Sequence, residues 1–265
     1  MWISNKDATI QTFDFPDGQQ HIKLTPEHLD DSTVDVSYAI RNAADLFSLM
    51  QVAEILKHNN RPSRLNIKYL MGDRMERRIS NLEPATLTVV CNMINMAFPD
   101  SPVRVFCPHS DAASFLLKNY DDDRQQERNF FHWVNKQRQN DVDVILPDAG
   151  AGKRWHNYMN QYAFNNRRKV ECSKQRDMST GQLSGFGCPH EVKEHCVIVD
   201  DLCDGGGTFC GLAVKLRENG AKTVDLAVCH GIFSKGYRLE GIDHIFTTNS
   251  YQDHLALPHV SVYRV

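Results

Sequence analysis

The segment CVIVDDLCDGGGTF, from Cys196 to Phe209, joins an apolar run, two adjacent acids, three glycines and a threonine. The β-branched run Val197–Val199 predicts a buried strand that ends at the acids, and a helix is expected to open at the threonine. Glycines let successive N–H groups face one point, where the helix N-terminus adds about half a positive charge. We therefore expect a phosphate-binding turn whose neighbouring carboxylates face sugar hydroxyls or a metal. An ordinary strand–turn–helix connection needs neither the acidic pair nor three glycines.

The composition limits the class of protein. The 265 residues suffice for two compact domains or one large one, and 41% hydrophobic with 24% charged residues is ordinary for a globular enzyme. A net charge of −3 disfavours a general nucleic-acid binder. No apolar run reaches membrane length, and the N-terminus lacks an apolar leader. We expect a cytoplasmic protein with reduced thiols that binds neither nucleic acid nor membrane.

Strand and helix patterns alternate along both halves of the chain, which predicts parallel sheets with helices on both faces. A Pro-Asp-Gly turn near the N-terminus predicts a hairpin. The polar segment Asp121–Glu127 predicts a surface loop or the end of a domain. The main predicted helices are Tyr38–His58, Pro84–Ala97 and the one opening at Thr208. The other predicted strands are Leu65–Tyr69, Val103–Phe106, Val142–Leu146, Thr223–Cys229, Ile245–Asn249 and Val260–Tyr263.

Functional side chains gather where predicted strands end, which is where open α/β sheets bind ligands. The charge-rich loop 71–78 follows one strand and His109 follows the next, although a charge run alone is usually a solvated face. In the second half, Asp148 and the pair Lys153–Arg154 follow a strand. A basic segment with Lys174 and Arg176 then leads into the Ser- and Gly-rich stretch Met178–Pro189, which we expect to be mobile.

The segment CPHEVKEHC, residues 188–196, holds zinc-type ligands. It lacks the His-Glu-x-x-His spacing of metalloproteases and the Cys-x-x-Cys spacing of structural sites. A zinc site is therefore disfavoured, although the sequence leaves open whether Cys188, His190, His195 and Cys196 bind a metal.

Taken in order, these motifs resemble the ribose-phosphate diphosphokinase (phosphoribosyl-diphosphate synthetase) family, from about Phe13 to near the C-terminus. The resemblance implies an α/β protein of two type I phosphoribosyltransferase-like domains, each a mainly parallel sheet flanked by helices. We predict an N-terminal domain on the ATP side over residues 1–128. A C-terminal domain over residues 129–265 would carry the ribose-phosphate loop.

The resemblance assigns roles to individual residues. In the family, the hairpin segment binds the adenine of a neighbouring subunit's ATP, so a homo-oligomer is implied. The residues expected to bind ATP are Phe15, Asp17, Gln19, Arg74, Glu76, Arg77 and His109. Those expected to bind the ribose phosphate are Asp200, Asp201, Asp204, Gly205, Gly206, Gly207 and Thr208. The metal, Mg²⁺, is expected at His109 and Asp148, and the catalytic pair is Lys174 and Arg176.

The chemistry implied is transfer of the β,γ-diphosphate of ATP to the anomeric hydroxyl of ribose 5-phosphate, which releases AMP. Such a transfer depends on positioning and charge neutralisation. Several positions depart from the family pattern. Gly205 replaces a threonine, Cys107 replaces an acid and Gln19 replaces a glutamate. The first strand and helix and the last helix of the family are largely missing, so its hexamer and allosteric phosphate site stay open.

Four functions fit these motifs. The first is synthesis of phosphoribosyl diphosphate. The second is the same transfer to ADP-ribose, as in phage NAD-salvage variants, which would place the protein in the host cytoplasm; missing side chains at Gly205 and Gly206 would leave room for this acceptor. The third is a catalytically silent regulator, and the fourth is a plain phosphoribosyltransferase. The sequence does not separate the first two.

Overall fold

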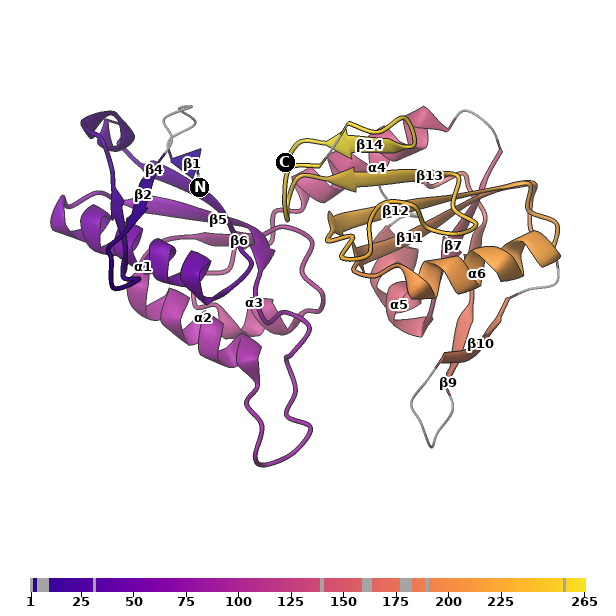
Figure 1. The fold of residues 1–265 in the computed structure, drawn as a ribbon, viewed down its shortest axis with the longest axis horizontal. Helices are drawn as coiled ribbons and strands as arrows, with labels where there is room; N and C mark the ends of the chain where they lie inside the picture. Colours follow the sequence, from indigo (N-terminus) through magenta and orange to yellow (C-terminus); the bar gives the residue numbers. More distant parts are fainter. Residues whose placement is uncertain are drawn as a thin grey trace. The chain divides into compact units, whose positions relative to one another are not determined.

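A computed structural model describes residues 2–3, 10–30, 32–138, 141–158, 164–176, 183–188, 191–254 and 256–265. It describes the backbone alone at 2, 156–158, 174–176 and 183–184. The chain forms two compact units, Met1–Arg124 and Gln125–Val265, called here the N-terminal and C-terminal units (Figure 1). In the described residues, no helix combines the length and apolar character needed to cross a bilayer.

The N-terminal unit is built on a four-stranded sheet in the order β1-β4-β5-β6. The last three strands run parallel, and β1 pairs antiparallel at the edge. Its strands are β1 (Trp2–Ile3), β4 (Val34–Ile40), β5 (Ser63–Leu70) and β6 (Val103–Val105), with a separate hairpin of β2 (Gln11–Asp14) and β3 (Gln20–Lys23). Its helices are η1 (Pro26–Leu29), α1 (Ala43–His58), α2 (Thr86–Ala97) and α3 (Ala112–Leu116).

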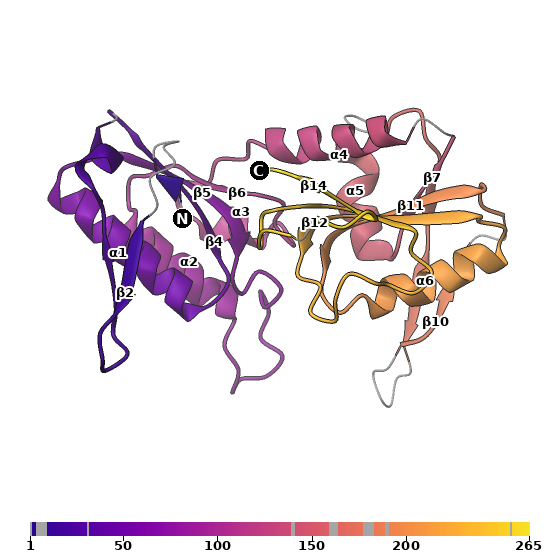
Figure 2. The same ribbon diagram turned by 45° about the horizontal axis from the view of Figure 1, so that its top comes forward.

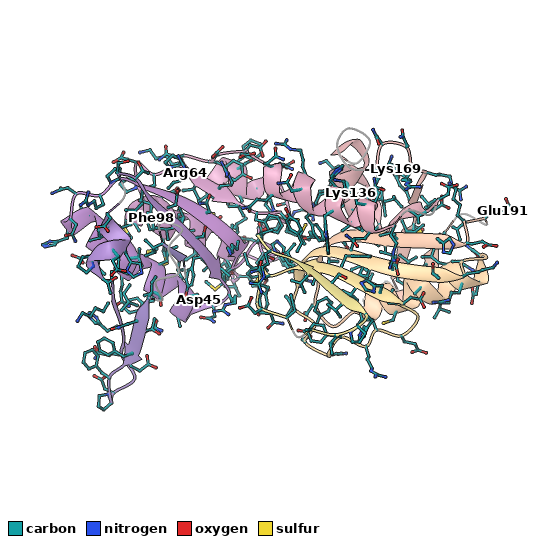
Figure 3. All side chains as sticks on the ribbon, turned by 90° about the horizontal axis from the view of Figure 1, so that it is seen from above. Asp45, Arg64, Phe98, Lys136, Lys169 and Glu191 are labelled. Atoms are coloured by element: carbon teal, nitrogen blue, oxygen red, sulfur yellow. The ribbon has the colours of Figure 1, made fainter. Side chains whose placement is uncertain are left out.

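Helix α1 begins later than the apolar pattern predicts, because Tyr38 to Ile40 belong to β4. There Tyr38 pairs with Ile67 of β5. The side chain of Asn42 accepts the Asp45 N–H at 3.0 Å and caps the helix. The Tyr38 hydroxyl also donates to Asp45, labelled in Figure 3, at 2.8 Å. A strand pairing and a cap thus override the helical period.

The C-terminal unit holds a six-stranded sheet in the order β14-β13-β12-β11-β7-β8, in which every neighbouring pair is parallel. Helix α6 covers one face, and α4 and α5 cover the other (Figure 2). The strands are β7 (Asp143–Leu146), β8 (Lys169–Glu171), β11 (His195–Cys203), β12 (Thr223–Gly231), β13 (His244–Thr248) and β14 (Val260–Tyr263). The helices are α4 (Gln125–Gln137), α5 (Ala149–Tyr158) and α6 (Gly207–Glu218), and β9 (Ser173–Arg176) pairs with β10 (Leu183–Gly187) as a hairpin.

Three parts of the C-terminal unit differ from the sequence-based expectation. Helix α4 starts inside the predicted polar loop, because Phe130, Phe131 and Val134 form a fully buried stripe on a helix that is mostly polar elsewhere. Helix α5 was not predicted at all. In the stretch 178–189, expected to be mobile, residues 183–187 form β10, and residues 178–182 and 189 lie outside the described residues.

Candidate active site

The acidic pair lies within strand β11 and not beyond its end, because β11 continues to Cys203 through pairing with β12. Asp201 is buried, and its Oδ1 lies 2.8 Å from Nη1 of Arg154 on α5. Asp200 is only partly exposed, and its Oδ1 accepts the Asp201 N–H at 2.9 Å. Asp201 and Arg154, which follow two different predicted strands, are therefore brought together as an ion pair.

The pKa of Asp200 is raised well above the usual range of a carboxyl group. Burial is the main cause, followed by the charge of Asp201, and Asp148 contributes as well. A carboxylate in such a place gains most from a nearby cation. This edge of the sheet therefore favours a metal ion or a protonated acid.

Asp148 sits between β7 and α5 and caps the helix. Its Oδ1 accepts the Ala151 N–H at 2.9 Å, and its carbonyl oxygen accepts the Gly152 N–H at 2.8 Å. An Asp that follows a strand and precedes small residues is a capping signal, from which α5 could have been predicted.

The residues at this edge fit a magnesium ion that takes only some of its ligands from the protein. No group of three or more His, Cys, Asp or Glu side chains forms a metal cage in the described part of the chain, which leaves out His190. Mg²⁺ commonly binds one or two carboxylates and completes its shell with water and substrate phosphates. Asp148 and Asp200 provide two carboxylates of that kind. The nearby charge of Asp201 adds to the negative charge that a cation would neutralise.

The glycine turn leads from β11 into α6. Gly206 is the N-cap residue with φ +76°, and a Cβ there would collide with Leu239. Its carbonyl oxygen accepts the N–H groups of Phe209 at 2.9 Å and Cys210 at 3.0 Å. Only glycine suits this position, because the left-handed backbone and the close approach of Leu239 both exclude a side chain.

The segment after β12 braces the turn. The Ser234 hydroxyl donates to Asp204 Oδ1 at 2.6 Å, and the Ile232 N–H donates to the Cys203 carbonyl oxygen at 2.8 Å. Phe233 adopts φ +49°, an uncommon conformation for a bulky residue. The turn is therefore fixed by contacts from a second loop.

The expected free space at Gly205 and Gly206 is already filled. A Cβ on Gly205 would lie 3.3 Å from Cδ and 3.4 Å from Cε of Lys235, and Leu239 occupies the space beside Gly206. By contrast, a Cβ on Gly207 would meet nothing within 4 Å. The missing threonine side chain makes room for the stem of Lys235, a residue that the sequence reasoning did not select.

The backbones of Lys174 and Arg176 lie in β9, paired with Phe186 and Leu183 of β10. They therefore lie in a hairpin strand, where a loop was expected. Their side chains lie outside the described residues, so their catalytic role stays a prediction.

In the N-terminal unit, two predicted ATP-side loops are joined by hydrogen bonds. The His109 N–H donates to Asp73 Oδ2 at 2.5 Å, and the Ser110 hydroxyl donates to Glu76 Oε2 at 3.0 Å. Asp73 is buried and Arg74 is exposed. Asp73 and Ser110 were missed as site residues, although each lies four residues after the end of a predicted strand.

Other predicted ATP-side residues are at the surface. Arg77 is exposed, with Nε 3.3 Å from Glu76 Oε1. Asp17 and Gln19 lie in the β2–β3 turn, where Asp17 Oδ2 accepts a hydrogen bond from Gln19 Nε2 at 2.8 Å. Phe15 is 48% exposed and packs against Phe13 with ring centroids 5.3 Å apart. The hairpin thus presents aromatic rings to solvent.

No family model matches the chain. The ribose-phosphate pyrophosphokinase of Mycoplasmopsis pulmonis is 26% identical over 193 residues, which cover 71% of this chain and 59% of that protein. The same-named proteins of Mycoplasma genitalium and Sulfurisphaera tokodaii are 24% and 25% identical over 89% of this chain, and 73% and 82% of their own lengths are covered. The chain is thus distantly similar to ribose-phosphate pyrophosphokinases over most of its length.

The fold agrees with this similarity. A crystal structure of phosphoribosylpyrophosphate synthetase from Mycobacterium smegmatis superposes with a TM-score of 0.75 and 19% identity, covering 97% of this chain and 86% of that one. The predicted α/β class, with parallel sheets flanked by helices, is confirmed. The chain spans only 59% and 52% of the lengths of the first two curated relatives, the second being the Ureaplasma parvum ribose-phosphate pyrophosphokinase.

Proposed function

We propose that the protein transfers the β,γ-diphosphate of ATP to the anomeric hydroxyl of a ribose 5-phosphate acceptor, giving phosphoribosyl diphosphate and AMP. The observation that carries this proposal is the group of Asp148, Asp200 and the Asp201–Arg154 pair at the sheet edge that leads into the glycine turn. The similarity to ribose-phosphate pyrophosphokinases supports the same reaction.

The acceptor would bind in the C-terminal unit. The N–H groups of Gly205 to Thr208 would hold its 5-phosphate, because the first N–H groups of a helix have no partner within the helix. Asp200 would accept hydrogen bonds from the ribose hydroxyls, and Asp201 would do so while Arg154 fixes its orientation. Asp204, tied to Ser234, would keep the turn in place.

ATP would bind in the N-terminal unit. Arg74 and Arg77 are exposed and could each direct two N–H donors at phosphate oxygens. His109 would lie beside them, its backbone held by Asp73. Phe15, with Asp17 and Gln19, would offer an aromatic surface to the adenine of a neighbouring copy, so the active form would be a homo-oligomer.

Magnesium ions would neutralise the phosphate charge. Asp148 and Asp200 would hold one in the C-terminal unit, and His109 would bind one in the N-terminal unit. The protein's own contribution would be positioning. Lys174 and Arg176, on β9, would bring positive charge to the transferring group, where charge builds up in the transition state.

ADP-ribose is a second candidate acceptor, because the side chain of Lys235 lies against Gly205 in the phosphate turn. An ammonium group on a flexible stem beside the phosphate turn would pair with the second phosphate of such an acceptor. The product would be ADP-ribose pyrophosphate, as expected of an NAD-salvage enzyme. The observation that favours ADP-ribose is the positive charge of Lys235. Free space no longer supports it, because Lys235 and Leu239 fill the space beside Gly205 and Gly206.

The test is to incubate the protein with ATP, magnesium and either ribose 5-phosphate or ADP-ribose, and to separate the nucleotides. AMP that appears only with an acceptor supports the proposal, and the better acceptor identifies the substrate. ADP as the main product would contradict diphosphate transfer. No turnover with either acceptor would favour a silent regulatory homologue or a plain phosphoribosyltransferase.

A further inference from the structure

Two thiols face each other at the base of hairpin β9–β10. Cys172 precedes β9 and Cys188 follows β10, and their Sγ atoms lie 2.9 Å apart. The ladder pairs Ser173 with Gly187, so the cysteines occupy the next opposed position. Opposed residues in an antiparallel ladder have Cα atoms about 4.5–5.5 Å apart, within the range of about 4.4–6.8 Å seen in disulfides. The backbone thus holds both thiols where a disulfide forms with little movement.

The two thiols have different surroundings. Cys172 is buried and extends β8, its N–H donating to the Leu146 carbonyl oxygen at 2.9 Å. Cys188 is partly exposed. The hydrogen bond from Cys172, helped by the charge of Lys215, lowers the pKa of Cys188, whereas the same bond and burial raise the pKa of Cys172. An accessible thiol beside a buried partner is the usual arrangement of an attacking and a resolving cysteine.

The base of the hairpin is also anchored to α6. A Cβ on Gly211 would come within 2.7 Å of Phe186 Cε2, so Phe186 packs where a side chain is missing. Because α6 begins at the glycine turn, the hairpin base connects the acceptor loop with the strand of Lys174 and Arg176. A covalent bond between Cys172 and Cys188 would fix this connection.

We infer that Cys172 and Cys188 are a redox-active dithiol, which a small-molecule disulfide oxidises to a cross-link across the hairpin base. The Cys188 thiolate attacks one sulfur of oxidised glutathione, forming a mixed disulfide and releasing one glutathione. Cys172 gives up its proton to solvent and attacks the Cys188 sulfur, which expels the second glutathione. The two protein thiols are oxidised to one disulfide, and oxidised glutathione is reduced to two thiols.

The consequence for activity rests on the proposed function. Lys174 and Arg176 lie within four residues of Cys172, so the cross-link restrains the strand that would place them. Displacing a catalytic group by about 1 Å can cost roughly a hundredfold in rate. We expect oxidation to lower turnover about tenfold and dithiothreitol to restore it.

The experiment treats the full-length protein with oxidised or reduced glutathione, counts free thiols by alkylation and mass spectrometry, and assays AMP release in parallel. Cys172→Ser and Cys188→Ser are the test variants. Cys210→Ser is the matched control, because Cys210 is another partly exposed cysteine of the C-terminal unit. Wild type and Cys210→Ser should each form one disulfide that joins the peptides of Cys172 and Cys188, with reversible loss of turnover. Neither test variant should form it. Cys188→Ser should keep its turnover, whereas Cys172→Ser should stop at the mixed disulfide of Cys188 with glutathione.

The outcomes separate the two ideas. If the wild type keeps all its thiols free in oxidised glutathione, or if Cys188→Ser still loses turnover reversibly, the dithiol inference is overturned. A disulfide that leaves turnover unchanged would overturn its regulatory consequence. If the reduced protein releases no AMP with either acceptor, the proposed function fails, while the thiol count still decides whether the dithiol exists.

Discussion

The two units carry opposite arrangements of charge at the carboxyl edges of their sheets. In the C-terminal unit, the carboxylates of Asp200 and Asp201 lie within a strand, and Arg154 pairs with one of them. In the N-terminal unit, Arg74 and Arg77 are exposed, and the buried carboxylate of Asp73 accepts a backbone N–H. The first arrangement suits hydroxyl groups and a cation, and the second suits a polyanion. The same βα architecture can thus present two kinds of site.

The largest effect on stability should come from Arg154→Met. This change breaks the ion pair between Arg154 and the buried Asp201 carboxylate, and breaking a buried pair typically costs about 3–5 kcal/mol. Urea denaturation measures the loss, and Arg154→Met with Asp201→Asn should recover most of it. The matched change in the N-terminal unit is Arg77→Met, whose exposed pair with Glu76 should cost about 0–1 kcal/mol. Equal losses of stability in Arg154→Met and Arg77→Met would contradict the proposed difference between the buried and the exposed ion pair.

The next effect concerns catalysis by the hairpin. Lys174→Ala should lower turnover by roughly 10²–10³, the usual result of removing one transition-state donor. Acceptor KM should change far less, because the acceptor would bind at the glycine turn. Lys222→Ala, which removes an exposed lysine paired with Glu194, is the control. Steady-state kinetics with turnover near normal in Lys174→Ala would refute the catalytic role.

A smaller loss of stability should follow Gly206→Ala, because φ is +76° and the new methyl group would collide with Leu239. The backbone strain alone is worth about 1–2 kcal/mol. Gly207→Ala, where a Cβ meets nothing within 4 Å, should be close to neutral in thermal unfolding. Similar melting temperatures for the two variants would show that the turn is not held as described.

Asp200 should make stability depend on pH. Because its pKa is raised on folding, the folded state holds the proton longer, and stability falls as pH rises from the unfolded value, about 3.9, to the folded one. The slope for one group cannot exceed about 1.4 kcal/mol per pH unit. Without added metal, Asp200→Asn should flatten this slope and raise stability at neutral pH. Urea titrations across pH 4 to 8, as an approximate window, would contradict the assignment if both proteins gave the same slope.

The smallest effect should be on acceptor choice. If Lys235 pairs with the second phosphate of ADP-ribose, Lys235→Ala should lower kcat/KM for ADP-ribose about tenfold, or about 1.4 kcal/mol, and leave ribose 5-phosphate nearly unchanged. Gly205→Thr should act in the same direction, because its side chain would displace the Lys235 stem. Equal losses with both acceptors would exclude a role for Lys235 in acceptor choice.

Local patterns were enough to predict the strands that precede the site loops, such as β5, β6, β7 and β11, and the loops that follow them. Val197–Val199 is β-branched, and parallel strands place their carboxyl ends at one edge, so Asp200 and His109 could be assigned to such edges from sequence. The start of α1 could not be predicted from sequence, because Tyr38 fits the helical apolar period but pairs with Ile67 as part of β4. Contacts between residues far apart in the chain carry no local signal.

Three such contacts change the account of the site. Lys235 fills the space at Gly205, Arg154 pairs with Asp201, and Cys172 meets Cys188, each across at least sixteen residues of chain. A sequence motif indicates which side chains are present at a strand end. Tertiary packing decides which of them are already paired and which stay available to a ligand.

The most direct test of diphosphate transfer follows the phosphorus atoms of ATP. The protein would be incubated with magnesium, the better acceptor and ATP labelled at the β-phosphorus, and the products separated. If diphosphate is transferred, the label moves into the acceptor's diphosphate in step with formation of unlabelled AMP, and omitting magnesium abolishes the transfer. Label recovered in ADP, with a single phosphate on the acceptor, would contradict it.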